Sequence, residues 1–228
     1  MSKNLFNIFL ILFFSTSSTI VSAGGVSLGA TRVVYNSEEK EAKLTVINSD
    51  SRSNFLVQSW VEDGSGNKIK AFIITPPLFL LRSDKESSLR IIYAGDKLPD
   101  DRESLFWINV KVIPSIDDSY GNKNTMQIAI QNRIKLFYRP NSINKYDENL
   151  ADRLKFKLSK GRITVSNPTP YYITLVNVKS EVGKSVSNHI IPPLADFELS
   201  KDLGTSNELS YQTVNDYGAL TPIRKIKI

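Results

Sequence analysis

One long strand-like run decides how the rest of the chain is interpreted: TMQIAIQNRIKLFYR, residues 125–139. Side chains alternate between the two faces of a strand, so Met126, Ile128 and Ile130 share one face, and Gln127 and Gln131 share the other. The run contains no proline or glycine and is much longer than the usual strand of about five to six residues. It is either a central strand whose apolar face is core, or an edge strand that offers its backbone and side chains to another protein.

The composition is that of a globular protein without cysteine chemistry. Of 228 residues, 41% are hydrophobic and 23% are charged, and none is cysteine, which excludes disulfides, thiol nucleophiles and cysteine metal sites. A single histidine, His189, disfavours a histidine metal site or a Ser-His-Asp triad. The net charge of +6 is scattered rather than gathered in a basic block, which argues against nucleic-acid binding. A G-x-S-x-G pattern at 25–29 lacks the preceding strand that a hydrolase needs. We therefore expect no enzyme activity, metal, cofactor or small-molecule substrate.

The amino terminus has the three parts of a secretory signal peptide. Lys3 supplies positive charge, residues 5–14 are mainly apolar, and Val21-Ser22-Ala23 offers a small-residue cleavage site. The alternative is a membrane anchor, but the apolar run is shorter than the roughly 20 residues that span a bilayer. We expect residues 1–23 to be removed and the mature chain to be exported.

The remaining sequence predicts two all-β units. Residues 25–113 contain about seven short strands separated by turns, which is typical of an immunoglobulin-like sandwich. These strands include a first one at 26–35, and Pro76-Pro77 interrupts another because proline lacks the amide donor. Residues 140–149 are polar and turn-prone like a linker, and a second β pattern follows from residue 154. Helical periodicity is nowhere sustained.

Several stretches, in this order along the chain, together resemble the PapD-like periplasmic pilus (fimbrial) chaperones of the chaperone–usher pathway. The stretches are Gly25–Tyr35 (GVSLGATRVVY), Pro76–Leu81 (PPLFLL), Glu103–Val110 (ESLFWINV), Gln131–Pro140 (QNRIKLFYRP), Ser166–Tyr172 (SNPTPYY) and Val214–Ala219 (VNDYGA). The resemblance implies an all-β fold of two immunoglobulin-like β-sandwich domains, residues 24–142 and 143–228, set as an L or boomerang with a cleft between them.

The resemblance also implies how such a protein works. Chaperone–pilin donor-strand complementation is an established case of β-strand addition, in which the chaperone's edge strand completes a pilus subunit. Here Met126, Ile128 and Ile130 would insert into the subunit's hydrophobic groove. The subunit would then be protected from aggregation and delivered to an outer-membrane usher from the periplasm. The same exposed strand would allow self-association of the unliganded protein.

Two further sets of residues match positions with known roles in that family. Arg32 and Lys135 match the pair that anchors the subunit's terminal carboxylate, where fixed cations make charge-assisted hydrogen bonds. Lys135 and Ile130 have opposite parity, so either a bulge, for which Asn132-Arg133 is the candidate, brings both to the partner's side, or one of the two assignments fails.

The second set is Glu103, Arg139 and Asp216, which match a buried ion network between the domains. Surface or outward-facing roles are the alternatives for both sets of charged residues. An alternative for the whole protein is a secreted immunoglobulin-like pilus subunit or adhesin.

Overall fold

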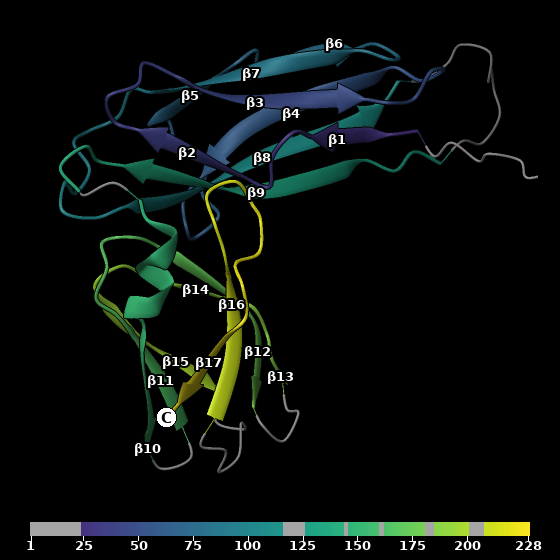
Figure 1. Cartoon of the computed structure of the whole chain (residues 1–228). Coiled ribbons are helices and arrows are strands. Elements are labelled where there is room, and N and C mark those ends of the chain that lie inside the picture. Colours follow the sequence, from purple (N-terminus) through teal and green to yellow (C-terminus); the bar gives the residue numbers. More distant parts are fainter. Residues whose placement is uncertain (1–23, 116–125, 144–145, 160–161, 181–184, 201–207) are drawn as a thin grey trace, which may run out of the picture.

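The protein folds into two β-sandwiches that meet at an angle (Figure 1). The structure is a computed structural model that describes residues 24–115, 126–143, 146–159, 162–180, 185–200 and 208–228. The predicted signal peptide and Thr125 lie outside these residues. Within the described ranges the only helix is a six-residue 3-10 turn, η2 (Glu148–Arg153), so no helix there is long and apolar enough to cross a membrane.

The first lobe packs two sheets face to face. One sheet has the order β1-β3-β7-β5 and the other β2-β9-β8-β4-β6. The first sheet consists of β1 (Val26–Leu28), β3 (Ala42–Asn48), β7 (Glu86–Tyr93) and β5 (Phe72–Thr75). The second consists of β2 (Arg32–Asn36), β9 (Ile130–Arg139), β8 (Ser104–Pro114), β4 (Phe55–Glu62) and β6 (Leu78–Leu81). All neighbours are antiparallel except β2 and β9, which run parallel.

The second lobe is a smaller sandwich. One sheet has the order β10-β11-β15, and the other β13-β12-β16-β17 with β14 also beside β12. The strands are β10 (Lys155–Ser159), β11 (Arg162–Asn167), β12 (Ile173–Ser180), β13 (Ser185–Val186), β14 (His189–Ile191), β15 (Ala195–Ser200), β16 (Glu208–Val214) and β17 (Arg224–Lys227). Each lobe has its own apolar cluster between its sheets, so each buries a core of its own.

Alternation along the strands explains both cores. In β3, Leu44 and Val46 are buried while Lys43 points to solvent, and in β8 Ile108, Val110 and Val112 are buried. Burying such apolar side chains is the main favourable term in the folding of a chain that has no disulfide. The predicted all-β fold is confirmed.

The first predicted strand is in fact two strands. Residues 26–35 break at 29–31, so that β1 lies in one sheet and β2 in the other. At the break Gly29 donates its N–H to Thr45 O (2.9 Å), and a Cβ there would lie 3.2 Å from Thr45 Cβ. The second break, at Pro76-Pro77, also separates strands of opposite sheets, β5 and β6. At both breaks the chain crosses from one sheet of the sandwich to the other.

Candidate functional site

Strand β9 has one edge that is only half covered. Strand β8 pairs with it from Ile130 to Tyr138, whereas β2 pairs only with Lys135–Arg139. Within the described part of the chain, residues 130–134 therefore have no strand on the side that β2 occupies further along. We call residues 130–134 the open edge. Such an edge presents unpaired backbone donors and acceptors to any extended segment that can pair with them.

The three apolar residues predicted to contact a partner lie on or beside this edge. Met126, Ile128 and Ile130 are 87%, 64% and 62% exposed, so the interpretation of this face as core is wrong. The strand begins only at Ile130, and the four described residues before it belong to no strand, which corrects the predicted start at 125. Gln127 Nε2 still donates to Pro114 O (3.3 Å), so this segment runs beside the end of β8. We call Met126, Ile128 and Ile130 the apolar ridge.

No bulge reconciles the ridge with Lys135. The register between β8 and β9 is continuous from Val112↔Ile130 to Ser104↔Tyr138, so the bulge predicted at Asn132-Arg133 is wrong. Ile130 shares the inner face of the sheet with Val112, and Lys135 lies on the outer face beside Trp107. Ile130 is exposed on the inner face because the packed core does not extend to it, although Ile134 still packs there. The edge thus offers apolar side chains on one face and a cation on the other.

Arg32 and Lys135 are cross-strand neighbours at the point where the open edge begins. Arg32 Nη1 donates to Val214 O of the second lobe (3.1 Å), and its Nε is buried without a hydrogen-bond partner. Lys135 Nζ lies 5.8 Å from the centre of the Trp107 ring. Among the residues that the structure describes, no carboxylate forms a salt bridge with either cation.

Burial is the main cause of the pKa shifts of both cations. Burial lowers the pKa of Arg32, although the charge of Asp216 opposes the shift. Burial also lowers the pKa of Lys135, and repulsion from Arg32 adds to the effect. Two partly buried cations side by side without an ion-paired carboxylate form a site that an anion would stabilise, because it would relieve both desolvation and repulsion.

The predicted ion network comes together between the lobes. Arg139 at the end of β9 donates through Nε to Glu103 Oε1 (2.8 Å), and through Nη1 and Nη2 to the two carboxylate oxygens of Asp216 (2.7 and 3.0 Å). Glu103 Oε2 accepts the backbone N–H of Tyr172 in the second lobe (2.9 Å). Burial raises the pKa of Glu103 to about 7, against the effect of Arg139. Burial alone would lower the pKa of Arg139, but its bonds to Asp216 and Glu103 raise it.

Aromatic and backbone groups that sequence reasoning missed complete this junction. The Arg139 guanidinium carbon lies 5.1 Å from the ring centres of both Tyr146 and Tyr171, and the Phe137 and Tyr172 rings are 6.0 Å apart. The N–H of Glu103 also donates to Pro170 O (2.9 Å). Backbone partners such as these cannot be recognised from side chains in the sequence. The stretch SNPTPYY at 166–172 does contain two of the aromatic residues, Tyr171 and Tyr172. The junction therefore holds the two lobes through charge, rings and backbone together.

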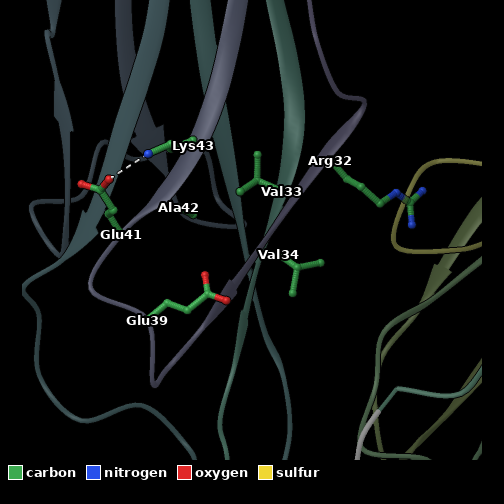
Figure 2. Close-up of a pocket in the computed structure, with 7 residues that line it drawn as sticks. All are labelled: Arg32, Val33, Val34, Glu39, Glu41, Ala42 and Lys43. Carbon is green, nitrogen blue, oxygen red and sulfur yellow. Dashed lines mark ion pairs between the residues drawn. The ribbon is translucent and has the colours of Figure 1, made fainter.

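A cavity of about 450 Å³ lies beside β2, and its lining includes Arg32. Figure 2 shows Glu39, Glu41 and Lys43 around it, while the Arg32 side chain points away from them toward the second lobe. An ion pair between Lys43 and Glu41 (3.5 Å) neutralises part of the wall. No group of three or more metal-ligating side chains occurs in the described part of the chain. The open edge and its cation pair are therefore the candidate functional site.

Two β-sandwiches locked at an angle, with an open strand edge, an apolar ridge and a cation pair, define a protein that receives an extended segment of a partner. Comparison with known proteins gives the family. Residues 25–144 match the N-terminal domain of PapD, the pili and flagellar-assembly chaperone, and residues 149–225 match the C-terminal domain of PapD, the pili assembly chaperone. The chain belongs to the PapD family of pilus-assembly chaperones.

Individual relatives support this assignment. The chain is 42% identical to a probable fimbrial chaperone, SfmC, of Escherichia coli K12 over 230 residues, which cover 100% of this chain and 99% of the relative. It is 45% identical to the chaperone protein FimC of the same strain over 199 residues, covering 87% and 82%. The predictions of a PapD-like fold and of a chaperone in pilus assembly are confirmed, and the alternative of a pilus subunit is not supported.

Solved structures show the same architecture. The periplasmic chaperone SfaE aligns with a TM-score of 0.77 at 42% identity, covering 88% of this chain and 98% of that one. The SafB chaperone, solved in complex with the SafA pilin of Salmonella enterica, aligns with a TM-score of 0.81 at 30% identity, covering 91% and 98%. The fold is thus shared with chaperones whose sequences differ at more than half of the positions.

Proposed function

We propose that this chain binds pilus subunits in the periplasm by lending them the open edge of β9. The observation that carries the proposal is the combination of an unpaired edge over residues 130–134 with an apolar ridge that water covers in the free protein. The complex of the related SafB chaperone with a pilin supports a subunit as the partner. The incoming strand would gain main-chain hydrogen bonds that do not depend on its sequence.

The proposal implies a direction for the bound strand. If the client's terminal carboxylate sits between Arg32 and Lys135 while its last strand pairs with residues 130–134, that strand runs parallel to β9. It then continues the line of β2, which is also parallel to β9 and begins at Arg32. The five positions from Ile130 to Lys135 correspond to roughly 16 Å of strand. The client therefore occupies the place along β9 that β2 leaves empty.

The apolar ridge and the cation pair would contribute to client binding in different ways. Each ridge side chain would contribute about 1.5–3 kcal/mol of transfer free energy if the client buried it fully. The cation pair adds charge-assisted hydrogen bonds and recognises a chain end, so it sets the register of the pairing. We propose that Glu103, Arg139 and Asp216 keep the lobes at the angle that this arrangement needs.

The remaining parts of the proposal concern the rest of the pathway. We propose that residues 1–23 form a cleaved signal peptide, and that the two domains divide at residues 142 and 143. The protein would act without catalysis or cofactor, would not bind nucleic acid, and would hand subunits to an outer-membrane usher. The exposed ridge would also drive self-association when no client is bound.

Co-expression with the pilus subunits encoded beside this gene tests the proposal. Ile128→Asp and Ile130→Asp should abolish co-purification of the subunit, because a buried charge at the groove would be costly. Both variants should keep the wild-type urea unfolding midpoint, since these side chains are exposed. The matched control is Ile73→Asp, an exposed isoleucine on β5 of the other sheet (48% exposed), which should retain the subunit. Subunit retained by both ridge variants would refute the proposal.

A further inference from the structure

A rigid turn of the second lobe stands beside the proposed client site. After β16, Asn215 Oδ1 accepts the backbone N–H groups of Tyr217 (3.1 Å) and Ala219 (2.9 Å), and Gly218 N donates to Asn215 O (3.0 Å). Gly218 adopts a φ of +83°, a conformation that favours glycine. Asp216 is held by both Nη atoms of Arg139. The turn is therefore fixed from within and from the first lobe.

Two contacts with the first lobe place this turn at the end of the open edge, and a third lies within the loop. Val214 O accepts a hydrogen bond from Arg32, and Leu220 forms a β-bridge with Val214. Gly218 lies against Thr31, because a Cβ on the glycine would come within 2.3 Å of Thr31 Oγ1. Thr31 immediately precedes β2. The turn therefore lies where β2 begins to pair with β9. In Figure 1 the loop after β16 rises from the second lobe to the first.

Two apolar side chains of this loop are exposed although the backbone around them is fixed. Tyr217 is 90% exposed and Leu220 is 56% exposed. A tyrosine on a rigid turn offers a large contact area at a small cost in conformational entropy, which is why such residues dominate binding energy at interfaces. A chain end seated at Arg32 would end next to Thr31 and Gly218, and Gly218 directly follows Tyr217 in the chain.

We propose that Tyr217 and Leu220 form a second contact for the client, against the residues that immediately precede its terminal carboxylate. The inference rests on the proposed function, because it places the client's chain end at Arg32 and Lys135. The first lobe supplies strand pairing and the ridge, and the second lobe supplies an apolar clamp on the end of the same strand. The second lobe thus takes part in recognition itself, beyond setting the angle of the cation pair.

An exchange equilibrium measures the contribution of Tyr217. A labelled complex of wild-type chaperone with a pilus subunit encoded beside this gene is mixed with unlabelled variants, and the subunit's distribution gives relative affinities. Tyr217→Ala should bind about 5- to 30-fold more weakly, Tyr217→Phe should restore most of the affinity, and Ile73→Ala should match wild type. Unfolding midpoints of the Tyr217 variants should stay unchanged because the side chain is exposed.

A photo-crosslinking amino acid at position 217 identifies the occupant. Benzoylphenylalanine at this position should crosslink to the last residues of the subunit; crosslinks only to another part of it, or to a second chaperone, would overturn the inference. Wild-type exchange by Tyr217→Ala would also overturn it. If Lys135→Met fails to hold the subunit in that case, the proposed function stands, whereas wild-type exchange by both variants would defeat the two together.

Discussion

Replacing Lys135 by methionine should weaken client binding and stabilise the free protein at the same time. The ammonium group lies half-buried beside Arg32, and its pKa is lowered by burial and by that neighbour. A lowered pKa means that the folded state disfavours the charged form, so this lysine costs stability at neutral pH. Methionine keeps most of the apolar stem and removes the charge, which separates the two effects.

The expected magnitudes follow from these surroundings. Removing a half-buried cation that lacks a salt-bridge partner should raise the free energy of unfolding by about 0.5–2 kcal/mol, the usual gain when a residue kept for function is replaced. Losing a hydrogen bond to a charged carboxylate should cost about 1.5–3 kcal/mol of binding, a loss of about 10- to 150-fold in affinity. A gain in the free energy of unfolding together with a loss of binding affinity is expected of a site whose charges are unfavourable until a client binds.

Urea unfolding and a peptide-binding cycle provide the assays. The peptide carries the last strand of the subunit with either a free carboxylate or a carboxamide at its end. Wild type should lose affinity on amidation, and Lys135→Met should lose less, because only Arg32 then remains to bind the carboxylate. Lys157→Met, at an exposed position of β10, controls for the loss of one positive charge. A Lys135→Met protein that is destabilised, or that loses as much affinity on amidation as wild type does, would refute the reasoning.

Two further predictions concern the network between the lobes. Burial holds the pKa of Glu103 at about 7 against 4.5, so its contribution to stability is full below about pH 4.5 and is lost as pH rises through about 7. Glu103→Gln should therefore flatten the dependence of unfolding free energy on pH, and an unchanged slope between about pH 5 and 7.5 would contradict this. Arg139→Met should lower the unfolding free energy by about 3–5 kcal/mol, because it leaves Glu103 buried without its cation. Arg102→Met, which breaks only an exposed pair with Asp101, should show no measurable loss, and equal losses in the two arginine variants would contradict a buried network.

Much of the fold could be predicted from the sequence because alternation with period two reports which face of a strand is buried. It indicated about seven short strands in residues 25–113, and Pro76-Pro77 marked a real break. It failed at 29–31, because alternation continues while the chain crosses from one sheet to the other. It also missed β15, where Pro192-Pro193 and the positive φ of Leu194 end one strand just before the next begins.

The candidate site, like the fold, could be predicted only in part from the sequence. Periodicity alone indicated the ridge, but only the exposure of Ile130 and its neighbours decided between core and edge. The cation pair and the ion network depended on family motifs, since no local pattern relates Arg32 to Lys135 or Glu103 to Asp216. Contacts made by backbone atoms, such as Val214 O with Arg32 and Tyr172 N with Glu103, carry no side-chain signal and could not be predicted.

The opposite parity of Ile130 and Lys135 restricts the register in which a client can bind. The register of β9 has no bulge, so Ile130 of the apolar ridge and the ammonium group of Lys135 face opposite sides of one strand at a separation of five positions. A client must then bring its carboxylate to the outer face while it covers the inner face with apolar side chains. Shifting its chain end by one residue would move every side chain to the other face. Discrimination therefore arises from the spacing between a chain end and an alternating pattern, which tolerates many sequences but only one register.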